Sequence, residues 1–266
     1  MPSARIGDID MHYEIGGSGP PVLFIGGTGG DLRQKPNVLD GPLVGDFTVA
    51  TFDQRGLGQT SKPDQAASMA DYGADAAGLL DHLGWSGVGV VGVSFGGMVA
   101  QELAIDRPDL VARLVLCCSS SGGEGGPSYP LHELTDLPEA ARQRRQLAIS
   151  DTRFDESWQD ENPVQAEKVF ARMQATAATP LDDAGSIGAR RQLESRSNHD
   201  TWERLHRIAA PTLVTAGRYD GIAPVSNSEA LVARIPKASL QIFEGGHLFL
   251  LQDRSSWPAI AGFLSR

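Results

Sequence analysis

The chain has 266 residues, 41% of them hydrophobic, which is enough for a substantial core and too apolar for a disordered protein. Its formal net charge of -10, from 23 basic and 33 acidic residues, argues against nucleic acid or an anionic membrane as a partner. Because no apolar run has the length of a membrane span and the first residues lack the apolar stretch of a signal peptide, we expect a cytoplasmic location.

The N-terminal segments predict two strands and a glycine-rich loop. Residues 9–15 alternate between apolar and polar side chains, which indicates a strand exposed on one face. Residues 21–25 are continuously apolar, as in a strand covered on both faces. The loop at 26–31 carries four glycines but matches neither a phosphate-binding loop nor a dinucleotide fingerprint. It could instead present backbone N–H groups to a developing oxyanion.

The next part of the chain alternates apolar, β-branched runs with segments of helical spacing. This alternation predicts a parallel sheet with helices on both of its faces. The predicted strands are 47–52, 88–93 and 111–118, and the predicted helices are 71–83 and 95–106.

The two cysteines, Cys117 and Cys118, end the last of these strands. Because they are adjacent, they cannot crosslink distant segments of the chain. We interpret them as small apolar residues that close the strand.

The junction between strand 88–93 and helix 95–106 contains Gly92-Val93-Ser94-Phe95-Gly96, the nucleophile-elbow pattern. In this pattern a strained turn pushes the serine oxygen clear of the backbone. Glycines would be required on both sides because strand and helix pass too closely for a Cβ. Since the chain contains 31 glycines, the pattern by itself is weak evidence for a catalytic serine. The rest of the sequence has to show whether Ser94 has suitable partners.

Residues 119–207 differ in character, because no strand-like run occurs there. Helices are predicted at 139–149 and 164–177, and Thr179-Pro180 predicts the start of another short helix. We therefore predict a helical cap at 121–207, inserted into a core domain formed by 1–120 and 208–266. The α/β alternation returns with strands 212–216 and 239–243 and helices 226–235 and 257–264.

Three loops at the carboxyl ends of predicted strands carry complementary side chains. Ser94 lies at the elbow, Asp220 follows strand 212–216, and His247 follows strand 239–243. An open parallel sheet brings such loops to one edge. The chain order serine, acid, histidine is the order of an α/β-hydrolase triad. Asp53 and Glu244 also lie at strand ends, and we expect Asp53 to have a structural role, paired with Arg55 or with neighbouring backbone N–H groups.

With these residues in place, the whole chain resembles the α/β-hydrolase family, in its esterase, lactonase and perhydrolase (non-haem haloperoxidase-like) group. Asp53-Gln54-Arg55-Gly56-Leu57-Gly58 is similar to the family's Asp-x-Arg-Gly-x-Gly loop, and Asp220-Gly221-Ile222-Ala223-Pro224 to its acid loop. The family commonly has His-Gly after its third strand, where this chain has Gly26-Gly27. Enol-lactone hydrolases also depart there, which points to lactone-like substrates.

The resemblance implies a mostly parallel eight-stranded sheet with the cap inserted after the sixth strand. It also implies a cofactor-free and metal-free serine hydrolase acting on a small-molecule ester or lactone. Ser94 would attack, His247 would move the proton, and Asp220 would orient the imidazole. The oxyanion would be bound by the backbone N–H of Phe95 and of Thr28 or Gly27. Substrate-lining candidates in the cap are Phe154, Trp158 and Met173; Phe170 belongs with them, and all could equally form the cap's own core.

Other readings remain open from the sequence. The same residues could cleave C–C bonds, make peracids or act as a cofactor-free lyase, and C–C cleavage would favour an acidic substrate held by cap arginines. Alternatively, the protein could be a hydrolase-like receptor with little turnover. Epoxide hydrolase and dehalogenase chemistry is disfavoured because position 94 is a serine and not a carboxylate. The oligomeric state is not visible in the sequence. The cap arginines in question are Arg142, Arg145, Arg190 and Arg191.

Overall fold

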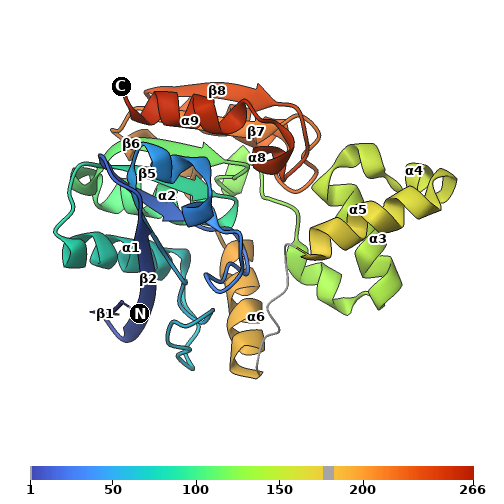
Figure 1. Cartoon of the computed structure of the whole chain (residues 1–266), viewed down its shortest axis with the longest axis horizontal. Helices are drawn as coiled ribbons and strands as arrows, with labels where there is room; N and C mark the ends of the chain where they lie inside the picture. Colours follow the sequence, from blue (N-terminus) through green and yellow to red (C-terminus); the bar gives the residue numbers. More distant parts are fainter. Residues whose placement is uncertain (1, 176–182) are drawn as a thin grey trace.

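The computed structural model of the protein describes residues 2–175 and 183–266 (Figure 1). Its centre is an eight-stranded sheet in the order β1-β2-β4-β3-β5-β6-β7-β8. β1 and β2 are joined in antiparallel fashion, β2 runs antiparallel to β4, and all remaining neighbours are parallel. The strands are β1 Ser3–Ile6, β2 Ile9–Gly16, β3 Pro21–Ile25, β4 Thr48–Phe52, β5 Val88–Val93, β6 Val111–Cys117, β7 Thr212–Gly217 and β8 Ala238–Phe243.

Helices cover both faces of this sheet, as the alternation of elements predicts. One buried cluster joins the sheet to α1, α2 and α7, and a second joins the opposite face to α8 and α9. Alternate residues of the central strands enter different clusters, for example Val90 and Val91, because successive side chains of a strand point to opposite faces. The helices are α1 Met69–Leu83, α2 Phe95–Asp106, α7 Val225–Arg234, α8 Phe249–Gln252 and α9 Ser256–Leu264.

The chain between β6 and β7 contains helices and no strand among its described residues. Figure 1 shows α3, α4 and α5 as a group to the right of the sheet, with α6 standing apart from them beneath the core. Their bounds are α3 Glu139–Ser150, α4 Glu156–Glu161, α5 Pro163–Ala175 and α6 Asp183–Ser197. The start predicted at Thr179-Pro180 lies outside the described residues.

Local sequence signals explain where helices α1 and α2 begin and end. α1 begins two residues before the predicted start because Ser68 and Asp71 form a reciprocal capping box. It ends at Gly84, which adopts φ 67°. α2 begins directly after Ser94 and ends at Asp106, before Arg107-Pro108, which matches the prediction.

Three short elements, β1, α4 and α8, were not predicted. β1 and α8 have four residues each and α4 has six, so none is long enough to show a periodic pattern. Both cysteines are buried and free, as expected. Among the described residues, no helix combines the length and the apolarity needed to cross a bilayer.

Candidate active site

The nucleophile-elbow segment forms a strand, a tight turn and a helix. Ser94 adopts φ 53° and ψ -114°, a conformation that non-glycine residues rarely take. A Cβ at position 92 would clash with the backbone of Gly96, and one at position 96 would clash with the carbonyl group of Ile25 in β3. The two flanking glycines are therefore needed for the close approach of α2 to β5 and β3.

Ser94, His247 and Asp220 lie in one hydrogen-bonded row. Ser94 Oγ is 3.0 Å from His247 Nε2, and His247 Nδ1 is 2.8 Å from Asp220 Oδ2. With Asp220 ionised, the proton of the neutral imidazole resides on Nδ1, so Nε2 is free to accept the Ser94 proton. The arrangement has the distances that a nucleophile, a base and an orienting acid require.

Backbone groups hold the acid and the histidine in this row. Asp220 Oδ1 accepts hydrogen bonds from the N–H groups of Ile222 and Ala223, at 2.8 and 2.9 Å. These two donors leave Oδ2 for His247. The row is thus fixed by loop geometry at the carboxyl ends of β7 and β8.

The C-terminal end of α3 is hydrogen-bonded to the two loops that carry Asp220 and His247. The carbonyl oxygen of Ile149 accepts from the N–H of Gly221 at 2.9 Å, and that of Ser150 accepts from His247 N–H at 2.7 Å. The last carbonyl groups of a helix lack partners within the helix, so they are available for such bonds. The cap region is therefore joined to the site through main-chain bonds to both loops.

The candidate oxyanion donors lie beside the nucleophile. The N–H of Phe95 is the first of α2 and has no acceptor within its own helix. Gly27 lies close to Ser94, since a Cβ on it would come within 3.6 Å of the serine Cβ. Thr28 follows in the same loop, and its buried hydroxyl has no partner among the described residues. The roles of Phe95, Gly27 and Thr28 stay predictions.

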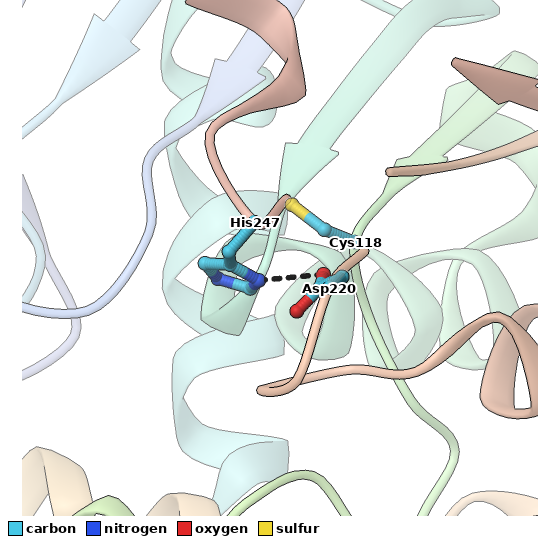
Figure 2. A group of neighbouring side chains, drawn as sticks. All are labelled: Cys118, Asp220 and His247. Atoms are coloured by element: carbon cyan, nitrogen blue, oxygen red, sulfur yellow. Dashed lines mark hydrogen bonds and ion pairs between the residues drawn. The ribbon is translucent and has the colours of Figure 1, made fainter. Parts of the chain in front are cut away.

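Figure 2 shows Cys118 beside the bonded pair of His247 and Asp220. One ligand atom of each of these three residues lies within 4.8 Å of the others. Burial raises the pKa of the Cys118 thiol well above its ordinary value, so the thiol is neutral at physiological pH. Both oxygens of Asp220 are already bonded, Oδ1 to two backbone N–H groups and Oδ2 to His247, and we therefore regard Cys118 as a packing residue beside Asp220.

Hydrogen bonds in the loop after β4 give Asp53 a structural role. Asp53 accepts from the N–H of Leu32 at 2.7 Å and of Gln59 at 2.8 Å, which ties two loops together. Arg55 pairs with Asp75 of α1 and not with Asp53. Of the two alternatives from the sequence, backbone pairing is the one that the structure contains.

Helix α6 lies directly over this loop and over the glycine loop after β3. The Cα of Gly188 packs against the backbone of Gly56, with no space for a side chain on either residue. Four hydrogen bonds run from α6 to main-chain atoms of other segments. They join Arg191 to Pro63 O, Gln192 to Gly29 N–H, Ser195 to Ala67 O, and Arg196 to Tyr129 O.

The substrate-lining roles of Phe154, Trp158 and Met173 stay predictions. Phe154 and Trp158 pack on each other, with ring centroids 4.7 Å apart. The side chain of Met173 lies outside the described part of the chain. Three of the four cap arginines form ion pairs with nearby glutamates, and the fourth binds Pro63 O. The pairs are Arg142–Glu139, Arg145–Glu156 and Arg190–Glu194.

Sequence reasoning missed two residues near the row. Ser119 donates from its hydroxyl to the carbonyl oxygen of Ser94. Arg196 of α6 is 5% exposed, whereas an arginine in a polar helix is expected on the surface. A polar helix with glycines at 185 and 188 was the available signal that α6 packs closely against another backbone.

With this fold and this row of side chains, comparisons with known proteins become informative. Residues 20–253 match the family model described as alpha/beta hydrolase fold. The chain belongs to the α/β-hydrolase fold family, and it is an enzyme of the hydrolase class.

Three similar proteins illustrate the family. Poly(3-hydroxyalkanoate) depolymerase from Ectopseudomonas oleovorans is 29% identical over 249 residues, which cover 92% of this chain and 84% of that one. 2-Hydroxymuconate semialdehyde hydrolase from Pseudomonas sp. (strain CF600) is 30% identical over 265 residues, covering 96% and 89%. The enol-lactonase from Burkholderia xenovorans LB400 shares the fold with a TM-score of 0.78 at 20% identity, over all of both chains.

Proposed function

We propose that the protein is a serine hydrolase that cleaves a small carboxylic ester or lactone through an acyl-serine intermediate. The observation that carries this proposal is the row from Ser94 Oγ through His247 to Asp220, with both links at hydrogen-bond distance. A serine hydroxyl is a poor nucleophile at neutral pH, and it becomes effective when an oriented imidazole accepts its proton.

The reaction follows from what each group can do. Ser94 Oγ attacks the substrate carbonyl carbon while His247 Nε2 takes the serine proton, and Asp220 stabilises the imidazolium. The negative oxygen of the tetrahedral intermediate is bound by the Phe95 N–H and by an N–H of Gly27 or Thr28. His247 then gives the proton to the leaving alkoxide, and the alcohol departs.

Water completes the cycle. His247 removes a proton from a water molecule, which attacks the acyl-serine carbonyl, and Ser94 is regenerated as the carboxylic acid leaves. In a lactone the alcohol and the acyl group belong to one molecule, so the leaving alcohol stays attached until this second step. The Gly26-Gly27 sequence, in place of the family's usual His-Gly, supports lactones as part of the substrate range.

The test compares wild type with Ser94→Ala on short 4-nitrophenyl esters and on small lactones. We expect hydrolysis by the variant to fall to the background rate while its circular dichroism stays that of the wild type. Turnover retained by a folded Ser94→Ala protein would contradict the proposal. Ser239→Ala, which removes an exposed serine of β8, is the control and should keep full activity.

A second measurement addresses the intermediate. After rapid mixing with a slowly deacylating ester and acid quench, mass spectrometry should find the acyl group on the peptide that contains Ser94. A burst of nitrophenol equal to the enzyme concentration should accompany it. If rapid mixing gives neither the burst nor the adduct while turnover continues, the acyl-serine mechanism is excluded, and direct attack by water or C–C chemistry would replace it.

A further inference from the structure

Arg196 of α6 is a buried arginine whose guanidinium is only partly used. Its side chain is 5% exposed, and Nη1 donates to the carbonyl oxygen of Tyr129 at 2.7 Å. Nε and Nη2 have no hydrogen-bond partner among the described residues. A buried cationic donor without a partner is costly for a folded protein, so its presence calls for a ligand that completes it.

The two free groups form one edge of the guanidinium. Nε–H and Nη2–H point the same way, and this edge matches the two oxygens of a carboxylate. Other arginines of the same chain use this edge in this manner, each with an aspartate at 2.5 to 3.0 Å. They are Arg33 with Asp31, Arg55 with Asp75, Arg107 with Asp109, and Arg153 with Asp151.

Arg196 is one of the residues that line a cavity of about 170 Å³, far larger than one water molecule needs. Met98, Ser120, Tyr129 and His199 are among its lining residues, together with Arg196. No other arginine or lysine lines this cavity among the described residues.

This cavity adjoins the proposed catalytic row on two sides. Met98 lies on the first turn of α2, and its N–H donates to the carbonyl oxygen of Ser94 at 3.3 Å. On the other side, Tyr129 N–H donates to the carbonyl oxygen of Ile222, a residue whose own N–H binds Asp220. Two walls of the cavity are therefore joined to the catalytic row by main-chain bonds.

Among residues 2–175 and 183–266, no carboxylate binds the Nε and Nη2 groups of Arg196. Asp220 is the carboxylate whose charge acts on Arg196, but both of its oxygens are occupied, by His247 and by two backbone N–H groups. Burial lowers the pKa of Arg196 to about 10, so it remains a cation at neutral pH. Burial also lowers the pKa of His199 to about 4, which leaves that neighbour neutral.

One turn before Arg196, Gln192 offers another buried donor. Its side chain is fully buried, and its Oε1 accepts from the N–H of Gly29 at 2.8 Å, in the loop that holds Gly27 and Thr28. Its Nε2 has no partner among the described residues. Residues four apart lie on one side of a helix, so Gln192 and Arg196 place their unpartnered donors on the same side of α6.

We propose that Arg196 binds a carboxylate of the substrate through its Nε and Nη2 groups, so that the natural substrate is an ester or lactone that itself carries a carboxylate. This inference rests on the proposed hydrolase function and specifies its substrate class. The carboxylate occupies the cavity beside Met98 and Tyr129, while the scissile carbonyl lies at Ser94. Gln192 Nε2 is available to a further oxygen of the same molecule.

The activity test uses a matched pair of esters, mono-4-nitrophenyl glutarate and 4-nitrophenyl pentanoate, which differ by a terminal carboxylate. Wild type should prefer the anionic ester in kcat/KM. Arg196→Gln should lower kcat/KM for the anionic ester about 100-fold more than for the neutral one, because a buried ion pair is lost. Arg196→Lys keeps the positive charge but lacks the paired Nε–H and Nη2–H donors, so it should lower kcat/KM for the anionic ester by an intermediate amount.

Arg190→Gln is the control, since it makes the same charge change on the exposed side of α6. It should leave the preference unchanged within about twofold, as expected for an exposed charge. If Arg196→Gln and Arg196→Lys fold and leave the ratio of the two kcat/KM values as in wild type, the proposal is overturned.

A binding test separates this inference from the proposed function. Calorimetry with Ser94→Ala should detect glutarate, and adding Arg196→Gln should weaken its affinity at least about tenfold. Equal affinity for both proteins, or no binding to Ser94→Ala, overturns the carboxylate site. If wild type hydrolyses neither ester but glutarate binds in an Arg196-dependent way, the hydrolase proposal fails and the anion site stands.

Discussion

The hydroxyl of Ser119 donates a hydrogen bond of 3.0 Å to the carbonyl oxygen of Ser94. It thereby joins the chain after β6 to the strained turn at the start of α2. Ser94 N–H is held from the same direction, because it donates to the carbonyl oxygen of Cys117 at 2.8 Å. The turn with φ 53° is thus fixed by bonds from a neighbouring strand end as well as by its own glycines.

Ser119→Ala should therefore loosen the nucleophile without removing any group that touches substrate. One hydrogen bond is worth about 1 kcal/mol, so we expect kcat to fall about three- to tenfold with little change in KM. Ser121→Ala, which removes a buried hydroxyl bonded within its own loop, is the control and should keep kcat. Equal kcat values for wild type and Ser119→Ala would show that the turn does not need this bond.

Asp220→Asn should reduce kcat on the order of 10³- to 10⁴-fold and leave KM nearly unchanged. The amide cannot stabilise the imidazolium, and it favours the wrong tautomer of His247. Glu244→Gln is the matched control, because Glu244 also follows a strand but pairs with Arg218 at the surface, at 2.7 Å. Steady-state kinetics on one ester measures kcat for both variants. If kcat falls strongly for Glu244→Gln and not for Asp220→Asn, Glu244 and not Asp220 is the acid of the triad.

Gly188→Ala should disturb the packing of α6 against the loop that contains Gly56. Its Cβ would clash with the carbonyl group of Gly56, and overpacking of this kind costs about 1–3 kcal/mol. We expect a lower thermal midpoint together with reduced kcat/KM. The same substitution at Gly262 in α9 meets open space, so it should raise the midpoint slightly. Unchanged stability at position 188 would mean that α6 moves freely against this loop.

His199 should make stability depend on pH. Burial lowers its pKa from 6.5 to about 4, so between these values the unfolded chain binds more protons than the folded one. The contribution of His199 is complete above pH 6.5 and declines as the pH falls, by about 3 kcal/mol at pH 4. Urea titrations at pH 7 and at pH 4.5 should show a smaller acid loss for His199→Gln than for wild type. Parallel losses would contradict the low pKa.

The sequence predicted the sheet, and it predicted the starts of α3 and α5 within one residue, but it did not predict how these helices pack. Long apolar strands and the elbow are set by local pattern, so β3, β5 and α2 have the predicted bounds. Which cap residues line a pocket depends on how α3–α5 are oriented relative to α6. The hydrophobic periodicity of the sequence does not predict this orientation. For this reason the pocket roles of Phe154 and Trp158 stay predictions, and the burial of Arg196 was not predicted.

The four bonds that seat α6 all end on main-chain atoms of other segments. Those partners are present whatever side chains occupy the contacted loops, so the loops can change sequence without detaching the helix. Helices α3–α5, by contrast, pack chiefly on one another and join the catalytic loops through Ile149 and Ser150. Directed evolution could thus replace α3–α5 together, while α6 stays bound to the core in its present position.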